Sequence, residues 1–503
     1  MLSIVSGKKT VATNSAKQII LISLTSLIFG HFMITKYIPN EALNVLALII
    51  ISYFIFYHTL RKNDLFSFIM VMYFCCTPPF LNSKGGGFNM VSFTCVIMYI
   101  LINKKLPTEK KLKDTLFYIL IAFFVLSSIL GWLLNFTGSN SDLIYSLITF
   151  FGLVFLLLIS SRLEITFSRI KIFLQINFFL IIYATIASIN KYFHIININT
   201  FIMPIYGESD SYFEGGGLIG SSPLYGENSM ILLLLFFVFI LSINLTNIFN
   251  KVTLYFFATL AFVNVFMSIS RSVFLLSIMG VLISVMFQYK LIKIKIERII
   301  LLIIALLIIS VSVITIVNYG GLSYVFNRVS EIENRNKLSG GLSLERIING
   351  SAFNREDAFR EARYRFESKD SWLIGYGWGM PNNNRDAFYV DTTISRGSAH
   401  SQIFAMLFIF GWIGFVAYFG LIFRIIYKSY KTLKNINSNN ISKIMAYFFM
   451  IAFILFFLNE IKADSVSMPS YFGVTIIWMG LTYSVNNMYD SKKQKKKNKR
   501  FIL

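Results

Sequence analysis

The stretch Ser395-Arg-Gly-Ser-Ala-His-Ser-Gln402 leads into an almost unbroken apolar run that carries Gly411, Gly414 and Gly420. It places His400 where a polar segment meets a candidate membrane span. The step from His400 to Gly411 is close to three helical turns, so His400, Gly411 and Gly414 are predicted to share one stripe of a single helix. Two interpretations stay open. Either Ser398 caps an ordinary membrane helix whose glycines admit a neighbouring helix, or the histidine serves chemistry.

The composition of the whole chain is that of a membrane protein. Of the 503 residues, 56% are hydrophobic, 17% aromatic and 14% charged, a balance outside the range of soluble globular domains. The first apolar run follows a few lysines without a small-residue cleavage site after it, so we expect a retained anchor. Cys75, Cys76 and Cys95 lie inside apolar segments with no metal-ligand spacing, which predicts buried packing residues rather than a disulfide or zinc site.

Apolar runs of membrane-spanning length recur along the whole chain. We count about fourteen, centred near residues 26, 51, 72, 95, 124, 151, 180, 234, 259, 280, 307, 411, 450 and 477. The third and fourth are interrupted by Pro78, Pro79 and the glycines 85–87, so a re-entrant pair is the alternative there. The predicted fold is an all-α polytopic membrane protein with about fourteen transmembrane helices and one long outer loop.

The distribution of charge predicts the orientation of these spans. With a cytoplasmic N-terminus, the inner segments hold most of the lysines and arginines but few acidic residues, which accounts for the net charge of +22 through the positive-inside rule rather than through nucleic-acid binding. Residues 1–317 then hold transmembrane helices 1–11, 318–398 form the outer loop, 399–487 hold helices 12–14, and 488–503 form a basic cytoplasmic tail.

Two outer segments are too long to be simple turns. Residues 191–223 are glycine-rich and are either a ligand-approaching loop or a flexible connector. In the second, 318–398, apolar positions within 344–366 recur at helical spacing, so we expect amphipathic helices on the outer face of the membrane.

Arginines dominate the basic residues of the long loop. A guanidinium matches phosphate oxygens and stays charged, so these residues are candidates for holding a pyrophosphate; they include Arg355, Arg360, Arg363 and Arg396, the last expected one helical turn before His400. Salt bridging to nearby acidic residues is the alternative for most of them. Arg271 differs because Ser268-Ile-Ser-Arg-Ser lies in a tight turn between two apolar spans, where a cation is costly unless it snorkels or binds something.

His400 is a candidate proton acceptor. The positive end of a helix dipole disfavours the imidazolium and favours a nearby phosphate, so one site could accept a proton from an attacking hydroxyl and hold an anionic leaving group. Glycosyl transfer from a lipid pyrophosphate needs this combination. Because no Asp-x-Asp motif follows an outer span, we predict no metal site and no cofactor.

The pattern His400-Ser401-x9-Gly411-x2-Gly414 resembles the signature of the bacterial O-antigen ligase and Wzy-type polymerase superfamily. The segments 354–362, Trp372-Leu-Ile-Gly-Tyr-Gly-Trp-Gly379 and 268–271 are similar to further motifs of that superfamily. The likeness extends over roughly residues 215–425. It departs from the family pattern at Phe359 and Ser371, where a tryptophan and a proline are common, and the stretch 220–223 matches only loosely.

This resemblance implies a GT-C-like membrane glycosyltransferase that acts without a metal on sugars linked to undecaprenyl pyrophosphate, at the periplasmic face of the bacterial inner membrane. His400 would be the general base or would position the acceptor, and Arg271 and Arg355 would contact the pyrophosphate. Arg360, Arg363 and Arg396 are our additions to that set. The implied partners are the undecaprenyl-pyrophosphate-linked oligosaccharide and membrane lipid, with a chain-length regulator as a further candidate and no nucleic acid.

Three functions remain on these grounds. A polymerase would transfer the growing glycan to another lipid-linked repeat unit, and the chain length and the predicted number of spans favour it. A ligase would instead use the lipid A core as acceptor. A flippase for lipid-linked oligosaccharide belongs to a different class, and the long outer loop and the His400 pattern disfavour it.

Overall fold

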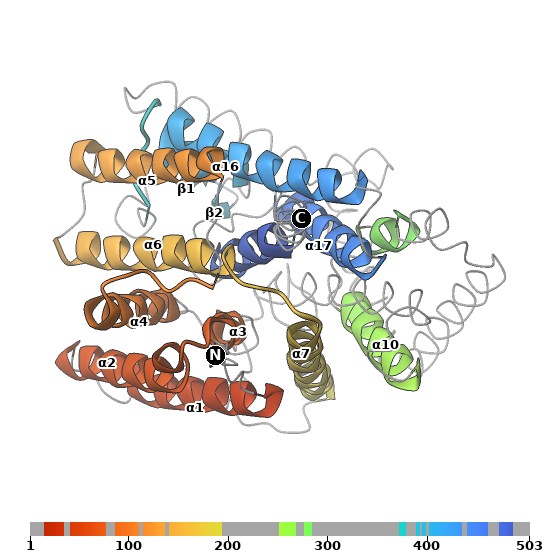
Figure 1. Cartoon of the computed structure of the whole chain (residues 1–503). Helices are drawn as coiled ribbons and strands as arrows, with labels where there is room; N and C mark the ends of the chain where they lie inside the picture. Colours follow the sequence, from red (N-terminus) through yellow and green to blue (C-terminus); the bar gives the residue numbers. More distant parts are fainter. Residues whose placement is uncertain are drawn as a thin grey trace, which may run out of the picture.

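The computed structural model describes residues 15–34, 41–76, 86–109, 114–135, 140–193, 251–267, 276–283, 372–378, 389–392, 395–398, 402–434, 440–460 and 472–485. Within these ranges the chain is mainly helical (Figure 1). The span centres predicted near residues 234 and 307, and the amphipathic helices predicted within 344–366, lie outside the described ranges. Every other predicted centre falls inside a helix, so the expectation of a helical membrane protein is confirmed there.

The labelled helices have the following bounds: α1 Ala16–Ile34, α2 Glu41–His58, the short 3-10 helix η1 Leu60–Lys62, α3 Leu65–Cys76, α4 Gly86–Asn103, α5 Thr115–Asn135, α6 Asn140–Ser160, α7 Phe167–Phe193, α10 Lys251–Met267, α16 Gln402–Lys434 and α17 Asn440–Glu460. Two further helical segments cover residues 276–283 and 472–485. A helix pairs its own backbone groups, which is why apolar sequences of this kind adopt it in lipid.

Four helical stretches in the described ranges are long and apolar enough to cross a membrane: Val45–Lys62, Thr115–Asn135, Leu143–Ser160 and Ala405–Lys434. Helix α3 is shorter, with 12 residues, and all of them are buried. At about 1.5 Å per residue it covers roughly 18 Å, too little to cross a hydrocarbon core of about 30 Å. The number of about fourteen crossings and the re-entrant alternative remain predictions.

The helices pack as a layered bundle (Figure 1). Helix α1 packs on α2, α2 on α4 and α4 on α6, while α7 packs on α10. Helix α3 lies inside this arrangement and contacts α1, α2, α4, α6 and α7. Cys75 and Cys76 of α3 and Cys95 of α4 are free and buried, so the prediction that they are packing residues is confirmed.

Helices α5 and α16 form the most extensive helix pair among those described, lying side by side in Figure 1. They run antiparallel, because Leu120 of α5 lies at Gly420 of α16 and Ser127 of α5 lies at Gly414. The glycines let the two backbones approach closely, as small residues do in membrane helix pairs. This pair links the first half of the chain to the motif that opens α16.

The structure corrects two expectations about the polar segment before α16. Strands β1 (Tyr389–Thr392) and β2 (Ser395–Ser398) pair in antiparallel register, with Tyr389 opposite Ser398 and Asp391 opposite Arg396. Arg396 therefore does not lie on a helical turn before His400, and Ser398 does not cap α16, which begins at Gln402. A strand pair there was unforeseen because the serine- and glycine-rich stretch shows no alternating apolar pattern.

The single helical stripe predicted from His400 to Gly414 is also wrong. Gly411 has φ 60° and ψ −172° inside α16, so the helix is broken at this residue. Helical spacing cannot be carried across a residue with those angles, which only glycine adopts readily. Residues 402–410 and 412–434 are two helices that meet at an angle.

Candidate functional site at the break in α16

The break at Gly411 frees backbone groups that an intact helix would pair internally. In a regular helix the N–H of Trp412 would donate to the carbonyl of Phe408, and that of Ile413 to the carbonyl of Ile409. An unpaired peptide group costs several kcal/mol in a membrane. The break therefore requires another segment to supply the missing partners.

The turn at residues 372–378 supplies them. The N–H groups of Trp412 and Ile413 donate to the carbonyls of Trp372 and Leu373, at 3.0 and 3.2 Å. In return, the N–H groups of Tyr376 and Gly377 donate to the carbonyls of Phe408 and Ile409, at 3.0 and 2.8 Å. The backbone groups of the turn thus replace the partners that are missing from the two lost helical hydrogen bonds, so that all four helix groups are paired.

Glycines make this approach possible. A Cβ on Gly411 would lie 2.5 Å from the backbone of Ile374, and one on Gly375 would meet the backbone N of Gly411. Gly375 and Gly377 also have positive φ, of 76° and 84°. The two glycine patterns singled out in the sequence, Gly375-x-Gly377 and Gly411, are therefore two sides of one contact between segments that lie far apart along the chain.

Helix α5 holds the other side of the turn. The Nδ2 of Asn135 donates to the carbonyl of Gly375 at 2.6 Å, and the Nε1 of Trp132 donates to the carbonyl of Trp378 at 2.8 Å. The N–H of Trp378 donates to the Oγ of Ser128 at 3.1 Å. The turn is thus fixed between α5 and the broken α16.

The last six residues of α16 before the break are enclosed by protein. Residues 405–410 are all buried, whereas beyond the break the side chains of Trp412 and Val416 are 41% and 61% exposed. The ring of Phe410 packs at 4.4 Å from that of Phe124 on α5. A helix buried on all sides has its direction set by its protein neighbours. Its first residue, Gln402, comes two positions after His400 in the chain.

The structure describes three of the predicted site residues and leaves the others outside its described ranges. Gly411 and Gly414 lie in α16, the first against the turn and the second against Ser127. Arg396 lies in β2, where its register partner is Asp391. The remaining residues, His400, Arg271, Arg355, Arg360 and Arg363, lie outside the described ranges.

The contacts from α5 were missed in the sequence. Asn135, Trp132 and Ser128 belong to a segment about 240 positions before the turn, and no local pattern links the two. One signal was present: Gly131 and the terminal asparagine mark the end of an otherwise apolar helix. A Cβ on Gly131 would meet the backbone of Gly377, so this glycine also serves the contact with the turn. Among the described residues, no group of three or more His, Cys, Asp or Glu side chains could hold a metal.

A charged cluster ties the opposite ends of α5 and α16. The carboxylate of Asp114 accepts hydrogen bonds from the Nη2 of Arg424 at 3.1 Å and from the hydroxyl of Tyr483 at 2.6 Å, and it pairs with the Nζ of Lys428 at 2.6 Å. Burial raises the pKa of Asp114, but these hydrogen bonds outweigh burial and hold the pKa well below its usual value. The carboxylate therefore stays ionised and holds α5, α16 and the segment 472–485 together.

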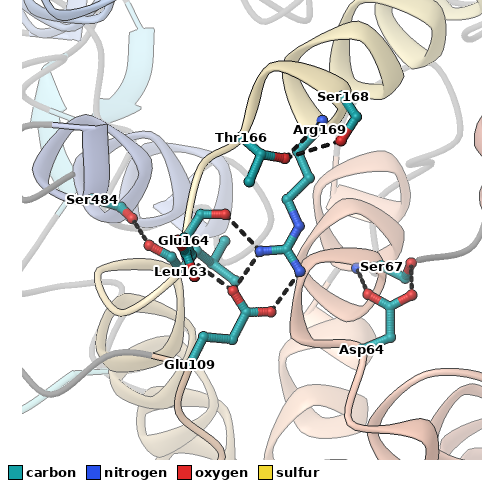
Figure 2. Close-up of polar contacts among 9 residues, drawn as sticks. All are labelled: Asp64, Ser67, Glu109, Leu163, Glu164, Thr166, Ser168, Arg169 and Ser484. Carbon is teal, nitrogen blue, oxygen red and sulfur yellow. Dashed lines mark hydrogen bonds and ion pairs between the residues drawn. The ribbon is translucent and has the colours of Figure 1, made fainter. Parts of the chain in front are cut away.

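A second charged cluster joins the start of α7 to two loops, the one after α4 and the one between α6 and α7 (Figure 2). Arg169, at the start of α7, forms a two-pronged ion pair with Glu109, with one of its hydrogen bonds at 2.7 Å. The backbone N–H of Glu164 also donates to Glu109, at 2.8 Å. The pair borders a cavity of about 730 Å³ that Tyr99 and Lys105 also line. Because the charges of Arg169 and Glu109 already satisfy each other, we interpret this cluster as a structural tie.

Comparison with protein families adds to this geometry. Residues 256–419 match the family model described as O-antigen ligase. The matched range contains most of α10, the turn 372–378, both strands and the part of α16 that carries Gly411 and Gly414, so the resemblance predicted from these motifs is confirmed. No curated protein matches the chain. Helix α5 lies outside the matched range, although it holds the turn.

Proposed function

We propose that this membrane protein, whose residues 256–419 match the O-antigen ligase family model, is a polysaccharide polymerase of the inner membrane. It would transfer a growing glycan from undecaprenyl pyrophosphate onto a sugar hydroxyl of a second lipid-linked repeat unit. The observation that carries the proposal is the contact between the turn 372–378 and the break at Gly411. It joins two motifs of the matched family and fixes the enclosed helix that follows His400.

The proposed reaction is an inverting glycosyl transfer. The acceptor hydroxyl oxygen attacks the anomeric carbon of the donor, the bond from that carbon to the pyrophosphate oxygen breaks, and undecaprenyl pyrophosphate leaves. His400 would accept the hydroxyl proton. Arg271 and Arg355, with Arg360, Arg363 and Arg396 as further candidates, would stabilise the negative charge on the leaving pyrophosphate.

Two alternatives differ in acceptor or in chemistry. A ligase would use the same donor and release the same leaving group, with the lipid A core as acceptor. The chain length of 503 residues and the predicted number of spans favour the polymerase. A flippase would perform no transfer, and the family match disfavours it.

The substitution His400→Ala in the native host tests the proposal, with surface glycan resolved on a ladder gel. His58→Ala, at the end of α2, is a matched control for loss of a histidine, and membrane abundance is compared by immunoblot. A polymerase predicts that surface glycan is reduced to single units. A ligase predicts glycan-free lipid core with accumulation of lipid-linked polymer, and a flippase predicts repeat units that stay inaccessible from outside. Unchanged chain length with full surface glycan would eliminate the role of His400.

A further inference from the structure

We infer that the end of α5, outside the family-matched range, positions the transfer site. Asn135 is the main positioning residue, and Trp132 and Ser128 assist it. The inference rests on the proposed function and deepens it, because it assigns part of the site's geometry to the first half of the chain. Its basis is the set of hydrogen bonds between α5 and the turn that completes the break in α16.

The turn needs α5 to hold its shape. Its backbone pairs with α16 through Trp372, Leu373, Tyr376 and Gly377. The carbonyl of Gly375, where φ is 76°, is paired instead by Asn135. This glycine touches the backbone of Gly411 directly. Asn135 therefore fixes the point at which the turn presses against the break.

The position of the break controls the helix that precedes it. Residues 402–410 form a helix about 13 Å long. A tilt of about five degrees at Gly411 would move its far end by about 1 Å, and a displacement of that size at a reacting centre can lower a rate by about 100-fold. The far end is Gln402, two positions after His400 in the chain. A small shift of the turn should therefore cause a larger displacement at the end of the helix that follows His400 in the chain.

Matched variants separate positioning from stability. Asn135→Asp keeps the shape of the side chain but removes the N–H donor, whereas Asn135→Gln keeps an amide donor. Asn103→Asp is the control, because Asn103 likewise ends a helix and donates to a backbone carbonyl, that of Tyr99 at 3.1 Å. All variants are prepared as the full chain in lipid nanodiscs, and their unfolding midpoints are recorded.

The first measurement reports geometry without any substrate. Spin labels at Gln402→Cys and Phe423→Cys lie on either side of the break, and Phe423 is 67% exposed. The native cysteines are buried, so they should not take label. Asn135→Asp should broaden or shift the distance distribution, Asn135→Gln should restore part of it, and Asn103→Asp should leave it unchanged. An unchanged distribution in Asn135→Asp overturns the inference.

The second measurement is transfer activity, with lipid-pyrophosphate-linked repeat unit extracted from the host as the probe. Asn135→Asp should lower kcat about tenfold with KM within about twofold, since the variant misplaces groups rather than removing donor contacts. A kcat equal to that of the wild type, or a loss no larger than the loss of folded protein, also overturns the inference. If His400→Ala keeps full activity while the spin-label distances still respond to Asn135→Asp, the proposed function fails and the structural link from α5 stands.

Discussion

Replacing Gly411 by alanine is the sharpest test of the broken helix. In an ordinary helix this substitution stabilises a protein by about 1 kcal/mol, because alanine has the higher helix propensity. Here the sign should be reversed. With φ 60° and ψ −172°, Gly411 occupies backbone space that is almost exclusive to glycine, at a cost of about 1–3 kcal/mol for other residues. Its Cβ would also lie 2.5 Å from the backbone of Ile374.

The alanine variant can avoid these backbone angles in one way, at a similar cost in free energy. If α16 straightens, Trp412 and Ile413 recover their helical bonds to Phe408 and Ile409, but the turn loses its partners. Tyr376 and Gly377 are buried, so their two unpaired N–H groups alone cost about 2 kcal/mol or more. Both routes give a destabilisation of about 3 kcal/mol.

Unfolding in mixed detergent micelles, followed by tryptophan fluorescence, measures this free energy. Gly420→Ala is the matched control on the same helix, because its Cβ would meet only the flexible end of Leu120, at 2.9 Å. We expect Gly411→Ala to be about 3 kcal/mol less stable than this control. If the two variants are equally stable, or if Gly411→Ala exceeds the wild type, the argument for the break is refuted.

Two further predictions concern the charged clusters. Asp114→Asn should lower the free energy of unfolding by about 2 kcal/mol at pH 7, because charged hydrogen bonds are lost. Folding lowers the pKa of Asp114. The stability advantage of the wild type should therefore be complete above about pH 4 and shrink as the pH falls below that value. The measurement is the unfolding midpoint of both proteins between pH 3 and pH 7. A difference between the two midpoints that stayed constant over this range would contradict the prediction. Glu109→Gln should cost about 2 kcal/mol because it leaves the buried Arg169 guanidinium with a weaker partner. Glu164→Gln is its control, since the structure uses the backbone rather than the carboxylate of Glu164, and equal midpoints for the two variants would count against the tie.

The helical membrane architecture followed from the sequence because its signals are local. Apolar runs of membrane length must form helices to pair their backbones, and the described helices lie where the runs predict them. The buried cysteines follow from the same apolar context. The family resemblance, too, depends on short motifs, and the match at residues 256–419 confirms it.

The described helices, the selection of Gly411 and the resemblance to the superfamily at residues 256–419 could therefore be predicted from local sequence patterns. The role of Gly411 depends on its neighbours in space, because the turn 372–378 that lies against it explains its backbone angles. The strand at Ser395–Ser398 and the role of Asn135 were beyond sequence reasoning for the same physical reason. Each depends on hydrogen bonds to a partner segment, and periodicity along one segment carries no information about that partner.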